Sequence, residues 1–210
     1  MESIQIKNMY DLNETIAAEI FEGKTYPWEV LPLIKEFIVK LGNTLSPEEY
    51  DKIGEDIWVA KSAKIAPTVA LNGPCIIGKD AEVRQCAFIR GSAIVGEGAV
   101  VGNSTELKNV ILFNKVQVPH YNYVGDSVLG YKAHMGAGSI TSNVKSDKKL
   151  VVVHGDGFDL ETGMKKFGAM LGDHVEIGWQ FRAESGNGDR TGEQCYPLSS
   201  VRGSCRRMRF

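Results

Sequence analysis

Two basic residues, Arg90 and Lys108, lie eighteen residues apart in the sequence. If the chain winds with eighteen residues per turn, their side chains stand one above the other on adjacent turns, about 5 Å apart. Two cations at that distance repel each other, and a phosphate or another anion between them would offset the repulsion. The spacing therefore indicates an anion site, although two ordinary surface charges that face solvent would give the same pattern.

A second set of residues suited to chemistry lies between residues 120 and 149. An imidazole, whose ordinary pKa is near 6.5, can accept a proton at neutral pH, so His120 is a candidate base. A surface histidine on a loop is the alternative. The set comprises His120, Tyr121, Tyr123, His134, Asn143, Lys148 and Lys149.

A zinc site of the carbonic-anhydrase kind would need three histidines that converge between subunits. His120 and His134 supply two, but the spacing of a third does not fit, and the cysteines form no CxxC pair. We therefore predict no metal site.

A strict six-residue repeat must position these side chains. Large apolar residues recur in one fixed phase, and a mostly small residue follows each of them four positions later. Glycine often comes directly after the large residue, as a tight corner needs. The large residues are Val59, Ile65, Leu71, Ile77, Val83, Ile89, Val95, Val101, Leu107 and Phe113.

A period of six fits neither an α-helix nor a single strand. A coil of three short parallel strands has this period, with eighteen residues per turn and one large side chain per face pointing inward. The repeat resembles that of the hexapeptide left-handed β-helix, a mainly β triangular prism. We expect this fold for residues 55–210. The prism alone leaves function open, because it serves both enzymes and inert scaffolds.

The repeat is interrupted twice. The phase fails after Phe113 and resumes four residues displaced at Leu129. A second interruption, a protruding loop at 144–166, contains a predicted hairpin of Leu150–His154 with Phe158–Glu161. Regular coils only stack, so these interruptions are where side chains can be aimed at a ligand.

Residues 1–54 predict a helical segment instead. Asp11 and Gly23 bound a first helix, a second carries Pro32 in its first turn and ends at Gly42, and Ser46 begins a third. We interpret this segment as a small N-terminal helical cap or an oligomerisation element, because nothing in it suggests chemistry.

Composition excludes several classes of protein. The 210 residues carry a net charge of −2, which argues against a general nucleic-acid binder. No apolar run is long enough for a membrane span, and the N-terminus does not look like a signal peptide. With few cysteines, a cytoplasmic protein without nucleic-acid or membrane partners is expected.

Residues 88–149 contain FIRGSAIVGEGAVVGN, STELKN, VPHYNYVGDS, GAGSITSN and SDKK. These segments resemble the acetyltransferase domain of the bifunctional glucosamine-1-phosphate acetyltransferase / N-acetylglucosamine-1-phosphate uridylyltransferase family. The related β-helical domains of sugar-1-phosphate nucleotidylyltransferases match at least as well. No nucleotidylyltransferase half precedes the repeat, so synthesis of a nucleotide sugar is not expected.

The resemblance implies an acetyl-CoA-dependent N-acetyltransferase, a homotrimer, that acts on an amino-sugar phosphate or nucleotide amino sugar of UDP-N-acetylglucosamine biosynthesis. His120 would be the general base, and acetyl-CoA the cosubstrate. His134 departs from the family, which commonly has asparagine there. The substrate-binding residues that it implies are Arg90, Lys108, Tyr123, His134, Asn143 and Lys149.

The alternative, from a different class, is a non-catalytic β-helical module for oligomerisation or sugar-phosphate sensing. Binding of acetyl-CoA distinguishes the two.

The C-terminal stretch 179–210 does not fit the repeat. Its inward slots at 183, 189 and 195 hold Ala183, Asp189 and Cys195. An unpaired buried charge costs several kcal/mol, so we predict an irregular excursion over 179–195. Suitable codons read with one base removed restore apolar residues at 183 and 189, which favours a disrupted reading frame over a divergent natural end.

Overall fold

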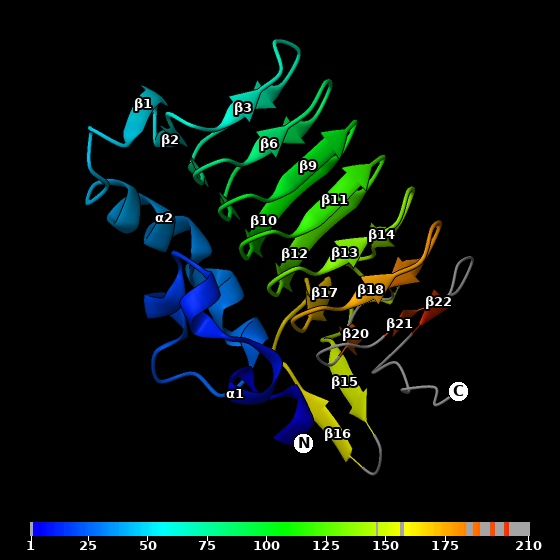
Figure 1. Cartoon of the computed structure of the whole chain (residues 1–210). Helices are drawn as coiled ribbons and strands as arrows, with labels where there is room; N and C mark the ends of the chain where they lie inside the picture. The colour runs from blue at the N-terminus through cyan, green and yellow to red at the C-terminus, as the bar shows by residue number, and fades with distance from the viewer. Residues whose placement is uncertain are drawn as a thin grey trace.

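The computed structural model describes residues 2–145, 147–155, 158–183, 187–189, 194–195 and 200–201. Its strands stack in parallel coils that form a long prism, and a helical segment runs along one side (Figure 1). The predicted mainly β fold, a parallel β-helix with a small N-terminal helical segment, is confirmed.

Within the described part of the chain, seven short parallel strands form one face of the prism. They are β3 (Lys64–Ile65), β6 (Glu82–Val83), β9 (Val100–Asn103), β11 (Gln117–His120), β13 (His134–Met135), β18 (Glu176–Ile177) and β21 (Gln194–Cys195).

The other two faces share one sheet, because β10 (Glu106–Leu112) and β12 (Tyr123–Leu129) continue around a corner. The first part of β10 pairs with β7, and its last part pairs with β8. The remaining strands of this sheet are β1 (Tyr50–Gly54), β2 (Ile57–Ala60), β4 (Ala70–Leu71), β5 (Cys75–Ile77), β7 (Phe88–Ile89), β8 (Ala93–Val95), β14 (Ile140–Thr141), β17 (Ala169–Leu171), β19 (Arg182–Ala183), β20 (Asn187–Asp189) and β22 (Ser200–Val201).

The strand register follows the predicted repeat. Val59 pairs with Ile77, which pairs with Val95 on the next coil, and all three are buried. On the seven-stranded face, Val83 pairs with Val101 in the same phase. The inward apolar column expected from the sequence is therefore present from the first coils onward.

Phe113, the tenth residue of the predicted inward series, was assigned wrongly. Leu112, not Phe113, pairs with Val95 and with Leu129, so the spacing at this face falls from eighteen residues to seventeen. The shortening occurs at a tight corner where Asn109 has a φ of 54°. Phe113 instead packs against aromatic rings of the helical segment, with centroids 5.1 Å from Tyr10 and 5.8 Å from Phe21.

The helical segment consists mainly of short 3-10 turns. The predicted first helix is wrong, because Thr15 is extended and its hydroxyl accepts the Ala17 N–H, which divides the stretch. The predicted third helix is also wrong, since the chain enters β1 at Tyr50 and pairs with β2. The elements are η1 (Glu2–Ile4), α1 (Ile6–Met9), η2 (Leu12–Glu14), η3 (Ala18–Phe21), η4 (Pro27–Leu33) and α2 (Ile34–Gly42).

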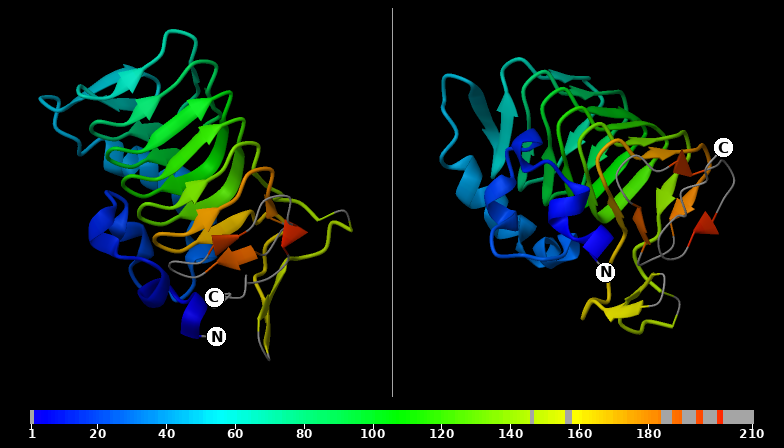
Figure 2. Two further views of the ribbon diagram at one scale, coloured as in Figure 1. Left: turned by 45° about the vertical axis from the view of Figure 1, so that its right-hand side comes forward. Right: turned by 60° about the horizontal axis from the view of Figure 1, so that its bottom comes forward.

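This segment lies along one side of the prism rather than over its end (Figures 1 and 2). Side chains alternate along a strand, so the middle residues of β5 and β8, and the β10 residue that pairs with them, point outward when their neighbours point inward. These outward residues, Ile76, Ile94 and Ile111, are fully buried, and α2 contacts all three strands. The outward isoleucine column explains why a helix must cover this face.

The second interruption forms the predicted hairpin, which projects from the prism (Figure 2). Its strands, β15 (Val152–Gly155) and β16 (Phe158–Glu161), pair antiparallel with Val153 opposite Leu160. An antiparallel bridge between Val144 and Lys166 closes the base of the loop.

The predicted irregular excursion after residue 179 is wrong where the chain is described. Strands β19, β20 and β21 extend the coils, with Ala183 opposite Thr141, Asp189 opposite Leu171, and Cys195 opposite Ile177. Main-chain hydrogen bonds to the exposed sheet edge do not depend on the side chain in the slot, which explains the continuation. The side chains that bear on the reading-frame hypothesis lie outside the described residues, so it stays a prediction.

Candidate functional site

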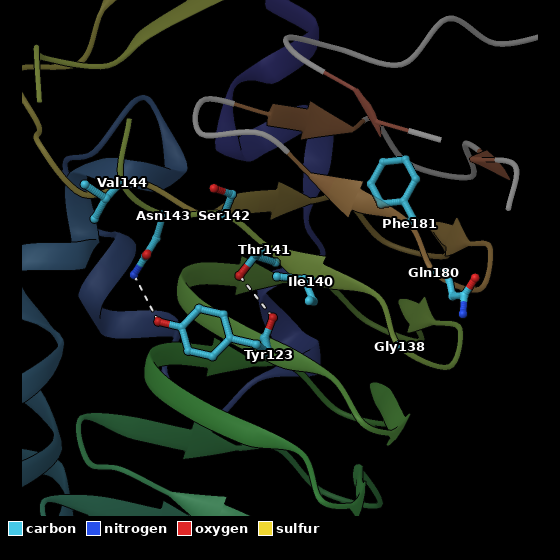
Figure 3. Close-up of a pocket in the computed structure, with 9 residues that line it drawn as sticks. All are labelled: Tyr123, Gly138, Ile140, Thr141, Ser142, Asn143, Val144, Gln180 and Phe181. Carbon is cyan, nitrogen blue, oxygen red and sulfur yellow. Dashed lines mark hydrogen bonds between the residues drawn. The ribbon is translucent and has the colours of Figure 1, made fainter. Parts of the chain in front are cut away.

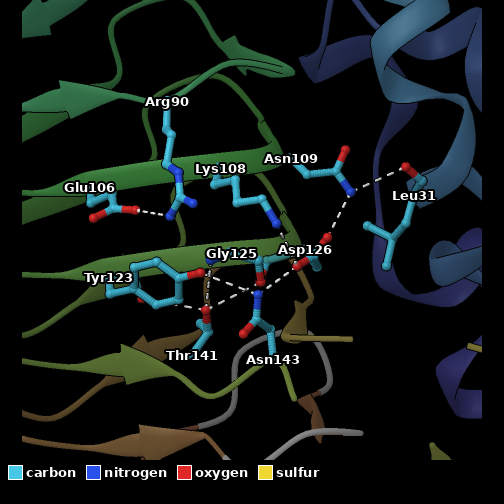
Figure 4. A network of polar contacts seen from close by, with 11 residues as sticks. Leu31, Arg90, Glu106, Lys108, Asn109, Tyr123, Gly125, Asp126, Thr141 and Asn143 are labelled. Carbon is cyan, nitrogen blue, oxygen red and sulfur yellow. Dashed lines mark hydrogen bonds and ion pairs between the residues drawn. The ribbon is translucent and has the colours of Figure 1, made fainter. Parts of the chain in front are cut away.

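Four of the predicted site residues gather on one outer surface of the prism: Arg90, Lys108, Tyr123 and Asn143 (Figure 4). This surface is formed by β7, the first halves of β10 and β12, and β14, and we call it the site face. Arg90 follows β7, and its backbone N–H donates to the Leu107 carbonyl. This hydrogen bond places Arg90 beside Lys108 on the next coil. Lys108 lies opposite Gly125 in the register. The predicted stacking of Arg90 and Lys108 is thus present.

Each of these cations already has a carboxylate partner. Arg90 Nη1 lies 2.9 Å from Glu106 Oε1, and Lys108 Nζ lies 3.8 Å from Asp126 Oδ2. These carboxylates offset the repulsion between the two cations, so the anion site at Arg90 and Lys108 stays a prediction. Glu106 lies on the coil after Arg90, and Asp126 lies on the coil after Lys108. The spacing of the two cations alone does not include these carboxylates.

Asp126 is the centre of the network on the site face. Its side chain is only 6% exposed. It accepts hydrogen bonds from Asn109 Nδ2 at 2.9 Å and from Asn143 Nδ2 at 2.5 Å, on the coils before and after it. Asn109 Nδ2 also donates to the Leu31 carbonyl of η4 at 3.2 Å, which joins the helical segment to the network.

Neither Asp126 nor Asn109 was predicted as a site residue. Asn109, Asp126 and Asn143 are spaced seventeen residues apart, and this spacing is the signal that could have found them. A search at eighteen residues misses the column, because the coils here are one residue shorter.

Tyr123 lies flat across the site face toward Asn143. Its hydroxyl oxygen accepts a hydrogen bond from Asn143 Nδ2 at 3.2 Å. Gly125 leaves room for the ring, since a Cβ at that position would lie 2.6 Å from the Tyr123 hydroxyl. Partial burial raises the pKa of Tyr123, and the nearby carboxylates of Asp126 and Glu106 add to the rise, so Tyr123 is a neutral hydroxyl at physiological pH.

A cavity of about 510 Å³ opens beside Tyr123 (Figure 3). Part of its wall is apolar, with Ile140 from β14 and Phe181 directly before β19, and part is polar. Such a combination suits a small ligand with both hydroxyl and apolar groups. The lining residues are Tyr123, Gly138, Ile140, Thr141, Ser142, Asn143, Val144, Gln180 and Phe181.

His120 ends β11 at the corner that leads into the site face. The corner is fixed by Asn122, which is buried and whose Oδ1 accepts the His120 N–H at 3.0 Å. The imidazole is exposed, and no described residue hydrogen-bonds to it. It is therefore free to approach a ligand, although it does not line the cavity beside Tyr123.

Two predicted residues lie away from this network. His134 Nδ1 lies 2.8 Å from Glu176 Oε2 and lines a separate cavity. Lys149 is exposed in the protruding loop, where its backbone N–H donates to Asp147. In the described ranges, no cluster of three or more potential metal ligands occurs, and no helix is long and apolar enough to span a membrane.

The stacked coils and the six-residue register define the class of this protein, a hexapeptide-repeat β-helix. Residues 71–185 match the model of the GMPPB C-terminal domain, and the chain belongs to this family.

Curated relatives match the same region. The chain is 34% identical over 157 residues to the bifunctional protein GlmU of Methanococcus maripaludis, with 74% of this chain and 38% of that protein covered. It is 32% identical over 158 residues to the bifunctional sugar-1-phosphate nucleotidylyltransferase/acetyltransferase of Sulfurisphaera tokodaii, with 72% and 39% covered. The chain thus spans less than two fifths of these relatives.

Among solved structures, the acetyltransferase domain of PglB from Neisseria gonorrhoeae is 14% identical with a TM-score of 0.36, over 88% of this chain and 78% of that one. The resemblance predicted from the sequence motifs, to GlmU-like proteins and to β-helical nucleotidylyltransferase domains, is confirmed by the family match and the curated relatives.

Proposed function

We propose that the protein is an acetyl-CoA-dependent N-acetyltransferase that acts on an amino-sugar phosphate, such as glucosamine 1-phosphate, or on a nucleotide amino sugar. The observation that carries the proposal is the juxtaposition of four predicted residues on the site face, Arg90, Lys108, Tyr123 and Asn143, inside the region that matches the family. The curated relatives named above, one of them an acetyltransferase by name, support the reaction type.

In the proposed reaction, the amino nitrogen of the sugar attacks the carbonyl carbon of the acetyl thioester. A carbon–nitrogen bond forms, the carbon–sulfur bond breaks, and coenzyme A leaves as its thiol. The exposed imidazole of His120 accepts the proton that the amine loses. The imidazole has no competing hydrogen bond within the described structure, which suits a base that must reach a substrate.

The acceptor is proposed to lie across the site face. Asn143 and the neutral hydroxyl of Tyr123 would hydrogen-bond to its sugar hydroxyls. Arg90 would exchange Glu106 for the phosphate, which costs little because exposed ion pairs contribute only about 0–1 kcal/mol. The long 3.8 Å contact from Lys108 to Asp126 leaves the ammonium donors available for the same phosphate. His134 and Lys149 lie away from the site face, so they can bind the acceptor only if a second subunit or a movement of the protruding loop brings them to it. A second subunit is in line with the proposed homotrimer.

A non-catalytic sugar-phosphate-sensing module is the second candidate. His120 does not line the cavity beside Tyr123, and this separation favours the alternative. Calorimetry with acetyl-CoA, together with turnover of glucosamine 1-phosphate, tests the proposal. Binding of acetyl-CoA with formation of the N-acetyl product supports the enzyme. Binding of the sugar phosphate without any binding of acetyl-CoA supports the sensing module.

A further inference from the structure

A second cavity, of about 580 Å³, lies at another corner of the prism, on the seven-stranded face. Gly98, Lys115 and Lys132 follow one another along this corner on successive coils, with φ angles of 63°, 59° and 55°. The Lys115 N–H donates to the Glu97 carbonyl, and the Lys132 N–H donates to the Asn114 carbonyl, which keeps the two lysines in register. The lining residues are Gly98, Lys115, Gln117, Lys132, His134 and Glu176.

Both ammonium groups gather over one aromatic ring. Lys115 Nζ lies 5.7 Å and Lys132 Nζ lies 5.0 Å from the centroid of Tyr131. The ring attracts cations through its negative face, but it carries no charge to neutralise them. The two lysines therefore present a local excess of positive charge beside the cavity.

The charges around this cavity differ from those on the site face. There, Arg90 and Lys108 each face a carboxylate. Here, no carboxylate among the described residues forms an ion pair with either lysine. The carboxylate that lines the cavity, Glu176, is hydrogen-bonded to His134 instead.

We propose that this cavity binds a phosphoryl group, held by the ammonium groups of Lys115 and Lys132 and the side-chain amide of Gln117. Ammonium-to-phosphate hydrogen bonds are charge-assisted, and the anion would offset the repulsion between the two lysines. Such a site is additional to the proposed phosphate contacts at Arg90 and Lys108. The lysines are seventeen residues apart, so a search at eighteen residues does not pair them.

The test is a titration of the ¹⁵N-labelled full-length chain with inorganic phosphate, followed by NMR. We expect the amide signals of residues 115–117 and 132–134 to shift, and the affinity to fall at least about tenfold in a Lys115→Ala/Lys132→Ala variant. A Lys115→Gln/Lys132→Gln variant keeps most of the side-chain packing, and its spectrum verifies the fold. Lys64→Ala is the matched control, because Lys64 is an exposed lysine at the far end of the same sheet.

Parallel titrations with glucosamine 1-phosphate and uridine 5′-diphosphate distinguish a sugar phosphate from a nucleotide as the source, and the tighter ligand identifies it. The proposal is overturned if these amides do not shift with phosphate. It is also overturned if the lysine-to-glutamine variant binds as tightly as the unmodified protein, or if Lys64→Ala weakens binding equally. Because no acetyl transfer is measured, failure of the proposed enzymatic function leaves this result unaffected.

Discussion

The side-chain amide of Asn143 lies 2.5 Å from the carboxylate of Asp126 on the preceding coil, and the same amide reaches the hydroxyl of Tyr123 at 3.2 Å. Asp126 thus holds a predicted substrate-binding residue in place without being one of the predicted residues. Through Asn109 the same carboxylate is joined to the Leu31 carbonyl, so the N-terminal segment takes part in supporting the site face.

The first prediction concerns Asp126. Asp126→Ala leaves two side-chain amides without their acceptor and should lower the free energy of unfolding by about 1–3 kcal/mol, as measured by urea denaturation. It should also raise the KM for the acceptor, because Asn143 and Lys108 lose their support. Glu106→Gln, at the partly exposed partner of Arg90, should change stability by less than about 1 kcal/mol. Equal stability losses in the two variants would contradict the central position of Asp126.

The second prediction concerns Gly125. A Cβ in Gly125→Ala would lie 2.6 Å from the Tyr123 hydroxyl and must displace the ring. We expect a higher KM for the acceptor with a nearly unchanged kcat. A Gly125→Ala/Tyr123→Phe double variant should lose little beyond Tyr123→Phe alone, because both changes act on the same hydroxyl. Additive losses in the double variant would show that Gly125 acts independently of Tyr123.

The third prediction separates the phosphate from the sugar. Arg90→Ala and Lys108→Ala should each raise the KM for glucosamine 1-phosphate by roughly tenfold or more, since a hydrogen bond to a charged group contributes about 1.5–3 kcal/mol. The same variants should leave the KM for a non-phosphorylated amino sugar unchanged. If both acceptors lose affinity equally, these cations do not contact the phosphate.

The fourth prediction is a pH dependence of stability. Burial raises the pKa of Asp173 above its ordinary value of 3.8, and N–H donors from Asp11 and Tyr131 offset only part of the rise. Asp173 therefore loses its proton at a lower pH in the unfolded chain than in the folded chain. Its contribution to stability is largest below pH 3.8 and is lost once the pH exceeds its folded-state pKa.

The contribution of Asp173 to stability should consequently fall as the pH rises from 3.8 through the raised folded-state pKa. Asp173→Asn, which cannot ionise, should reduce this slope in urea denaturation series at successive pH values. An identical slope in the unmodified protein and in Asp173→Asn would contradict the prediction.

The repeat predicted the β-helix because every sixth residue must be apolar to point into the prism. Nine of the ten proposed inward positions, Val59 through Leu107, pair in the expected register. The tenth, Phe113, was wrong because a tight corner at Asn109 removes one residue, which no apolar pattern records. The first helix was wrong because the Thr15 hydroxyl competes for a backbone N–H, a local bond that helix signals do not include.

The same corner explains which site residues were missed. Arg90 and Lys108 precede the shortening and were paired at the right spacing, whereas Asn109, Asp126 and Asn143 form a column only at seventeen residues. The carboxylate partners of the two cations were missed for a different reason. Charge neutralisation depends on contacts between coils, and Glu106 reaches back to Arg90 across sixteen residues.

The fifth prediction concerns His120 and the proposed reaction itself. The most direct test measures release of the coenzyme A thiol and formation of N-acetylglucosamine 1-phosphate from acetyl-CoA and glucosamine 1-phosphate, with the unmodified chain and with His120→Ala. His120→Ala should slow the reaction by about 100- to 10,000-fold, because a general base is lost. Its stability should be unchanged, because the imidazole is exposed and no described residue hydrogen-bonds to it. Turnover by His120→Ala equal to that of the unmodified chain, or no N-acetyl product from any amino-sugar phosphate or nucleotide amino sugar, would contradict the proposed acetyltransferase.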